Sequence, residues 1–157
     1  MNKKFLNIYN NLIKLTRNKL FYENALKTES FSDRLIIFFI HFAFFLKTYK
    51  NDSNKKEIQD LFDFVFKQIE LSIREIGYGD ATINKKMKVY VNTLYVIIDK
   101  VELWDTIDLN EKLDFFSDLI EVNKDANFYI NYFNKYQFYL TNNSFNYFTK
   151  EVISHKF

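Results

Sequence analysis

Apolar residues recur along most of this chain with the three- and four-residue spacing of an α-helix. A first helix is predicted over about 2–16 by the apolar residues Phe5, Ile8, Tyr9, Leu12 and Ile13. The clearest stripe predicts a helix over 55–76 and consists of Ile58, Leu61, Phe62, Val65, Ile69, Ile73 and Ile76. Between these two, a short helix is expected over about 18–27.

A further helix is predicted to begin near Ser30-Phe31-Ser32-Asp33 and to continue to about residue 49. Ser30 or Ser32 is a suitable N-cap, and Asp33 is favourable in the first turn. This segment is apolar nearly all round, which is typical of a helix buried at the centre of a domain. The polar run 50–55 then predicts a loop.

Three more helices are expected in the second half of the chain. Asp80 or Thr82 is a suitable start for the first of them, whose apolar residues are Met87, Tyr90, Val91, Leu94, Ile98 and Val101. Asp108 followed by Glu111 has the spacing of a capped helix start. The tail from residue 127 carries aromatic residues at helical spacing. We therefore predict one all-α domain of about six or seven helices over residues 1–157.

Composition sets limits on the class of protein. With 157 residues and 48% hydrophobic residues, the chain is long enough for one core and is not typical of disorder. Aromatic residues make up 20% of it, which A/T-rich codons would explain as readily as a stacking surface for nucleic acid. The net charge of +2 does not indicate nucleic acid. The absence of cysteine excludes disulfides and thiolate zinc sites.

Neither a membrane span nor a targeting peptide is expected. The longest apolar run, 35–46, has about twelve residues and contains His41, whereas a spanning helix needs about 20. Asparagines at positions 7, 10 and 11 interrupt the apolar part of the N-terminus, and no cleavage site follows. We expect a cytoplasmic protein.

The two glycines of the chain, Gly77 and Gly79, stand in one short phrase, and there is no proline. In a chain that otherwise lacks glycine, a glycine indicates a left-handed backbone conformation or another group that lies close to the backbone. The phrase ends the predicted 55–76 helix, where a glycine is a common C-cap. Arg74, Glu75 and Asp80 crowd the same place, and Glu70 is expected to pair with Arg74 at i, i+4.

Lys85, Lys86 and Lys88 follow at the start of the next predicted helix, where the positive end of the helix dipole disfavours basic residues. Departures from local rules are enriched at functional sites, so the lysines indicate a binding site. The alternative is structural: Glu75 and Asp80 neutralise the lysines, and the glycines make a rigid corner between two helices. The residues alone leave both interpretations open.

Other candidate residues carry weaker signals. His41 lies within the apolar helix, either as a hydrogen-bonded core histidine or as a polar group lining a pocket for a helical or haem-bearing client. Asp33 and Arg34 indicate a cap and a salt bridge, or a second part of a binding site. Only two histidines are present, His41 and His155, so neither a metal site nor a histidine-based catalytic triad is expected.

The glycine phrase also carries a family resemblance. Arg74-Glu75-Ile76-Gly77-Tyr78-Gly79-Asp80, followed by Lys85-Lys86-Met87-Lys88, resembles the hallmark of the ubiquinol–cytochrome c chaperone family. Tyr22, Asp33-Arg34, His41 and Phe45-Leu46 resemble an earlier segment of that family in the right order, and Gln59, Leu61-Phe62 and Phe66 resemble its following helix. The resemblance covers about residues 9–95. Family members often have Gly-Arg after the tyrosine matching Tyr95, where this chain has Val96-Ile97.

This resemblance implies an all-helical, non-catalytic chaperone that binds newly made cytochrome b during assembly of the respiratory cytochrome bc complex. It implies no cofactor, a possible small partner protein, and work at the cytoplasmic face of the inner membrane. Without a presequence, the chain resembles a bacterial member. The residues implied to contact the client or partner are Asp33, Arg34, His41, Arg74, Glu75, Gly77, Gly79, Asp80, Lys85, Lys86 and Lys88. A groove between helices with a charged rim would suit hydrophobic client segments.

Two alternatives come from other classes of protein. The first is a nucleic-acid binder that uses the lysines at 85–88 and the nearby Tyr90, although the net charge does not favour it. The second is a small helical enzyme that uses Glu75 or Asp80 as a general base. It lacks a partner acid, a metal site and a phosphate loop.

Overall fold

The structure is a computed structural model that describes residues 2–24, 31–120 and 126–150. It confirms the all-α prediction: the described residues form helices and no strand. The helices are α1 (Lys3–Thr16), α2 (Lys19–Asn24), α3 (Phe31–Tyr49), α4 (Lys55–Ile76), α5 (Asp80–Glu102), α6 (Leu109–Leu119), α7 (Asn127–Thr141) and α8 (Tyr147–Lys150). The last of these is a single turn.

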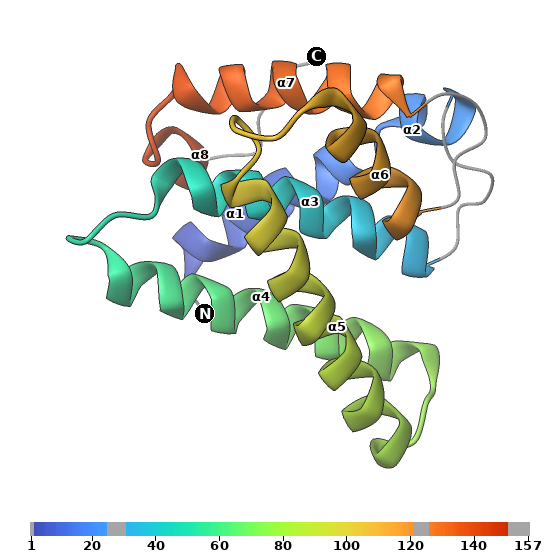
Figure 1. Cartoon of the computed structure of the whole chain (residues 1–157). Helices are drawn as coiled ribbons and strands as arrows, with labels where there is room; N and C mark the ends of the chain where they lie inside the picture. The colour runs from blue at the N-terminus through green and yellow to red at the C-terminus, as the bar shows by residue number, and fades with distance from the viewer. Residues whose placement is uncertain (1, 25–30, 121–125, 151–157) are drawn as a thin grey trace.

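Helix α3 lies at the centre of the molecule, as its all-round apolar sequence predicts. Figure 1 shows α3 with α7 above it, α4 below it and α5 crossing it, while α1 lies behind. Eleven of its residues are buried: Leu35, Ile37, Phe38, Phe39, Ile40, His41, Phe42, Ala43, Phe44, Phe45 and Leu46. A helix that buries every side needs neighbours on every side, and the other helices supply them.

Aromatic side chains fill most of this core. The rings of Phe44 and Phe133 stack with centroids 5.4 Å apart, and Trp104 meets Phe44 edge-on at 5.4 Å. Phe116 from α6 stacks on Tyr129 at 5.2 Å. Such offset and edge-on pairs of rings stabilise the folded state beyond the contribution of burying the rings. Most aromatic residues of α7 therefore belong to the core, whereas Phe138 is 72% exposed.

His41 is the one histidine that the structure describes, and it is a core histidine. Its side chain is fully buried, and its Nδ1 lies 2.8 Å from the carbonyl oxygen of Ile37. Because a carbonyl can only accept, Nδ1 carries the proton and donates it, and Nε2 accepts from the Tyr132 hydroxyl at 2.8 Å. Burial lowers the pKa of His41 to about 3, which keeps the imidazole neutral.

The asparagines of α1 also have a structural role. Asn7 donates to the carbonyls of Thr149 and Lys150, at 2.9 and 2.7 Å, and Asn11 donates to the Phe148 carbonyl at 3.0 Å. These carbonyls belong to α8, so the amides satisfy backbone acceptors at the end of the last helix. Residues that interrupt the apolar N-terminus in the sequence thereby tie α8 to α1.

Several predicted boundaries agree with the structure and two helix starts differ. The 55–76 helix has the predicted bounds, and Asp108 caps α6 by accepting from the Glu111 amide at 2.9 Å. Helix α3 begins at Phe31, so Ser32 lies within its first turn, and Ser30 lies outside the described residues. Gly79, and not Asp80 or Thr82, is the N-cap of α5.

Helix α5 is long enough to extend beyond the core. Its later part packs against α3, and its first turns form a hairpin with the end of α4 that projects from one end of the molecule (Figure 1). Within the ranges that the structure describes, no helix combines the length and the hydrophobicity that crossing a membrane requires.

The buried neutral His41 predicts a pH-dependent stability. The pKa of His41 is below its ordinary value in the folded state, so the unfolded chain binds the additional proton between about pH 6.5 and about pH 3. The free energy of unfolding should therefore be largest above about pH 6.5 and fall on acidification, by up to about 1.4 kcal/mol per pH unit from this residue. Urea unfolding at several pH values measures the slope.

A His41→Gln variant should lose this contribution to the slope, whereas His155→Gln, which removes the other histidine, should retain it. Equal slopes in the wild type and in His41→Gln would contradict the assignment. If His41→Gln is too unstable to measure, Tyr132→Phe tests the hydrogen bond to His41 instead. Removing that hydroxyl leaves Nε2 without its donor and should cost about 1–3 kcal/mol at neutral pH.

Candidate functional site

The turn between α4 and α5, residues 77–79, forms a sharp corner built on one glycine. Gly77 is the C-cap of α4, and its φ of 103° lies in the left-handed region. Among the described residues it is the only one with a positive φ. Its amide donates to the Arg74 carbonyl at 3.0 Å, which closes the last turn of the helix. One of the two expected special glycines is thus confirmed.

The backbone conformation at Gly79 does not require glycine. Its φ of −73° and ψ of 162° are extended angles that other residues adopt readily. A Cβ on either glycine would meet nothing within 4 Å. The backbone conformation at Gly77, and not a close contact, is therefore what requires glycine in this phrase.

An ion-pair network crosses the corner. Arg74, at the end of α4, donates to Asp80 at 2.6 Å and to Glu70 at 3.4 Å. The hydrogen bond to Asp80 is the main cause of a raised pKa at Arg74. The Glu70–Arg74 pair agrees with the prediction, but Asp80 is engaged with Arg74 and is not paired with the lysines. Exposed pairs of this kind add little stability, so the network chiefly orients the corner.

The lysines lie just beyond the corner. Lys85 and Lys88 are exposed, while the ammonium of Lys86 lies 4.7 Å from the centroid of the Tyr78 ring. Since α5 begins at Asp80, these residues occupy its second and third turns. The dipole effect falls off within the first turn, so it opposes them less than the sequence suggested. The structure places positive charge on an exposed surface next to Tyr78.

An exposed apolar stripe runs from these lysines along α5. Val89, Val96 and Leu103 follow each other at intervals of seven, which places them on one side of the helix. They are exposed by 58%, 56% and 53%. Lys85 and Lys100 lie on the same side, within about 60° around the helix axis. We call Lys85, Val89, Val96, Lys100 and Leu103 the α5 stripe.

The sequence analysis missed this stripe. It identified the other apolar side of the helix, which contains Leu94 and Val101, and both of these are buried. The seven-residue interval was a usable signal, because it puts three further apolar residues outside the core-facing side. The family resemblance described above implies a glycine at Val96, where this chain has an exposed apolar side chain.

A groove of about 440 Å³ lies beside the stripe, between α4 and α5. Phe66, Met87 and Val91 contribute its apolar lining, while Lys88 and Glu70 contribute charge. Phe66 is buried, and Lys88 is exposed. The corner, the groove and the first part of the α5 stripe therefore all lie on the α4–α5 hairpin, which carries apolar, basic and acidic side chains.

Three of the predicted site residues lie elsewhere. His41 is enclosed in the core and contacts Tyr132, so the interpretation as a core residue agrees with its position. Arg34 is exposed and lines a different cavity, between α1, α3 and α4, and Asp33 precedes it in the first turn of α3. The structure brings Arg74, Glu75, Gly77, Gly79, Asp80 and the three lysines together at the α4–α5 corner, and Asp33, Arg34 and His41 lie outside this corner.

The carboxylates at the corner have the geometry of surface residues. Glu75 and Asp80 are both exposed, and Asp80 accepts a hydrogen bond from Arg74. A general base works best in a site that excludes water and positions a substrate proton. Among the residues that the structure describes, no three histidine or carboxylate side chains gather where they would hold a metal ion.

The two glycines make a matched test of the corner. Gly77→Ala should lower the free energy of unfolding by about 1–2 kcal/mol, because alanine is strained in the left-handed region. Gly79→Ala should change it by less than about 0.5 kcal/mol, since its angles suit alanine. Thermal or urea unfolding compares the two. A Gly77→Ala variant as stable as the wild type would show that the corner relaxes into another conformation.

Comparison with known proteins places the hairpin within a family. Residues 27–103 match the family described as ubiquinol-cytochrome C chaperone. No curated protein and no solved structure matches the chain. The matched range ends at the C-cap of α5 and therefore contains the corner, the groove and the α5 stripe. The sequence resemblance to the ubiquinol-cytochrome C chaperone family is thus confirmed over residues 27–103.

Proposed function

We propose that this protein is a non-catalytic assembly chaperone that binds newly made cytochrome b, or a similar membrane client, during biogenesis of a cytochrome bc complex. The observation that carries the proposal is the α5 stripe: three large apolar side chains, each more than half exposed, on a helix whose other side is buried. Exposed apolar surface is costly in a free protein and is typical of a binding surface.

The shape and charge of the hairpin suit such a client. Segments of a membrane protein are apolar with polar flanks, and a helical segment docks by its apolar side in a groove between helices. The α5 stripe and the groove offer apolar contacts, while Lys85, Lys88 and Lys100 offer positive charge around them. We assign the apolar residues to the client's hydrophobic segment and the lysines to its acidic flanks or to anionic lipid.

In this proposal the corner serves as a scaffold. Arg74, Glu75 and Asp80, together with Gly77 and Gly79, set the angle between α4 and α5, and Lys85, Lys86 and Lys88 make the contacts. Basic residues next to exposed apolar side chains also favour an anionic membrane surface. We therefore place the protein in the cytoplasm, peripheral to the inner membrane, with residues 1–157 acting as one domain and with a small partner protein as a possible subunit.

A triple variant tests the lysines. Lys85→Ala, Lys86→Ala, Lys88→Ala should keep the melting temperature of the wild type, because Lys85 and Lys88 are exposed and the Lys86–Tyr78 contact is worth at most about 1 kcal/mol. It should lose co-purification with cytochrome b or with membranes. Affinity purification from the native cell, with quantitative mass spectrometry of membrane proteins, measures this.

The matched control is Lys3→Ala, Lys14→Ala, Lys135→Ala, which removes the same charge from exposed positions outside the hairpin. It should co-purify with the client as the wild type does. If the first variant still supports normal levels of the cytochrome bc complex, the lysines are not a binding surface. If binding is to nucleic acid instead, its affinity should fall steeply with added salt.

A second variant tests the apolar part. Val89→Ser, Val96→Ser should leave stability within about 0.5 kcal/mol of the wild type, since both side chains are exposed. It should weaken client binding by roughly 10-fold, as two apolar contacts are removed from the interface. Leu109→Ser, at an exposed apolar residue of α6, is the control. If the double variant and Leu109→Ser bind the client equally well, the α5 stripe is not the client-binding surface.

A further inference from the structure

A second cavity lies on the other side of α4, away from the α5 stripe. It has a volume of about 370 Å³, is partly open to solvent and is lined by residues of α1, α3 and α4 and by the C-cap of α1. This volume falls within the range of about 300–1,000 Å³ that is typical of small-molecule sites. The cavity lies outside the surface assigned to the client, so it calls for a separate explanation.

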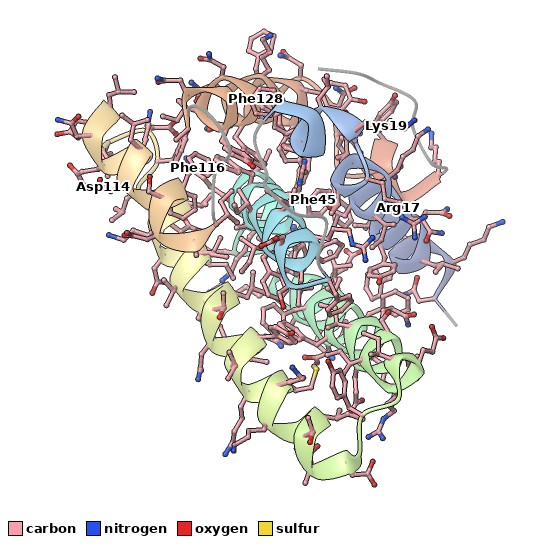
Figure 2. The ribbon with its side chains drawn as sticks, turned by 90° about the vertical axis from the view of Figure 1, so that its right-hand side faces the viewer. Arg17, Lys19, Phe45, Asp114, Phe116 and Phe128 are labelled. Carbon is pink, nitrogen blue, oxygen red and sulfur yellow. The ribbon has the colours of Figure 1, made fainter. Side chains whose placement is uncertain are left out.

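The lining of this cavity includes both apolar and charged side chains. Its apolar part includes Ile13, Leu35, Phe38 and Ile69, of which Leu35, Phe38 and Ile69 belong to the buried core. Two arginines, Arg17 from the C-cap of α1 and Arg34 from the first turn of α3, also line it, and both are exposed. Figure 2 shows Arg17 on the α1 side of the molecule, with α3 in the centre.

The charge of this cavity is positive. Its lining contains two guanidinium groups and no carboxylate. Among the described residues, no carboxylate lies within 4.0 Å of Arg17 or Arg34. Glu75, one turn beyond Ser72 on α4, is a nearby acidic residue, and Asp33 is next to Arg34 in the chain. Two arginines that line one cavity and have no carboxylate partner among the described residues are suited to hold an anion.

Neutral polar groups also line the cavity. Tyr9, Thr16 and Ser72 line the cavity, and the pKa of Tyr9 is raised because burial disfavours the phenolate. The Tyr9 hydroxyl is neutral and lies near Ser72 and Arg17. The lining thus combines cationic, neutral polar and apolar side chains.

We infer that this cavity binds a single-chain amphiphile with an anionic head group, such as a fatty acid or a lysophospholipid. The head group would meet Arg17 and Arg34, and the start of the hydrocarbon chain would pack on Ile13, Leu35 and Phe38. Inorganic phosphate would leave the apolar lining unused, and an uncharged lipid would leave the arginines unpaired. The carboxylate and phosphate head groups share this chemistry, and the test distinguishes them.

The test uses the purified full chain and the fluorescent probe dansyl-undecanoic acid. We expect saturable binding, displacement by dodecanoate or by dodecyl phosphate, and no displacement by dodecyltrimethylammonium or by inorganic phosphate alone. The stronger of the two anionic competitors identifies the head group. Displacement by the cationic amphiphile as effectively as by the anionic ones would overturn the role of the arginines, and the absence of saturable binding would overturn the site.

Matched variants locate the binding. Arg17→Gln, Arg34→Gln should weaken probe binding by roughly 10-fold or more, through loss of two charge-assisted contacts. Lys14→Gln, Lys19→Gln removes the same charge from exposed residues nearby and should stay within about twofold of the wild type. Ile13→Trp should block the cavity without changing charge. If the arginine double variant and the lysine double variant weaken probe binding equally, the attraction is non-specific and the inference is contradicted.

This inference does not depend on the proposed client. The probe assay contains neither cytochrome b nor membrane, so a negative result would leave the role of the α4–α5 hairpin untouched. Binding of the probe that survives Ile13→Trp but is lost in Val89→Ser, Val96→Ser would assign the probe to the α5 stripe and would overturn the cavity as its site.

Discussion

The complete burial of α3 is the constraint on which the rest of the structure depends. A helix that is apolar on every side has no stable place except between other helices, and the residues of α3 from Ile37 to Phe45 are almost entirely removed from water. Helices α1, α4, α5 and α7 surround it (Figure 1). The one polar side chain at its centre, His41, is tolerated because both ring nitrogens have partners.

This arrangement leaves the α4–α5 hairpin free to serve a different purpose. Once the later part of α5 has packed on α3, its first turns are not needed to cover the core, and they project with the corner at Gly77 (Figure 1). Selection for solubility alone would favour polar residues where Val89 and Val96 are exposed. Their presence on the hairpin, beside a row of lysines, is what a client-binding surface requires.

The sequence predicted the fold well because the signals were local and strong. The stripe of α4, the Asp108 cap and the left-handed glycine at the end of α4 each follow from residue types at a fixed spacing. The start of α5 was harder to place, because Asp80 is a good N-cap but is drawn to Arg74 across the corner. That ion pair depends on the turn geometry, which residue spacing does not specify.

The candidate site could be predicted only in part. The corner residues and the lysines are close together in the chain, so the sequence predicted that they lie near one another. The exposure of Val89, Val96 and Leu103, in contrast, depends on which side of α5 packs against α3. The cavity between α1, α3 and α4 joins Arg17 and Arg34 from two different helices. Nothing in the sequence indicates that these two residues line one cavity.

The central claim is that the α5 stripe contacts the client, and site-specific crosslinking in the native cell tests it most directly. A photoreactive amino acid at Val96, which is 56% exposed, should form a crosslink with newly made cytochrome b. The same amino acid at Asn131, an exposed position on α7, should not. Crosslinks to cytochrome b from both positions, or from Asn131 alone, would contradict the account, as would their absence from Val96 in cells that assemble the complex normally.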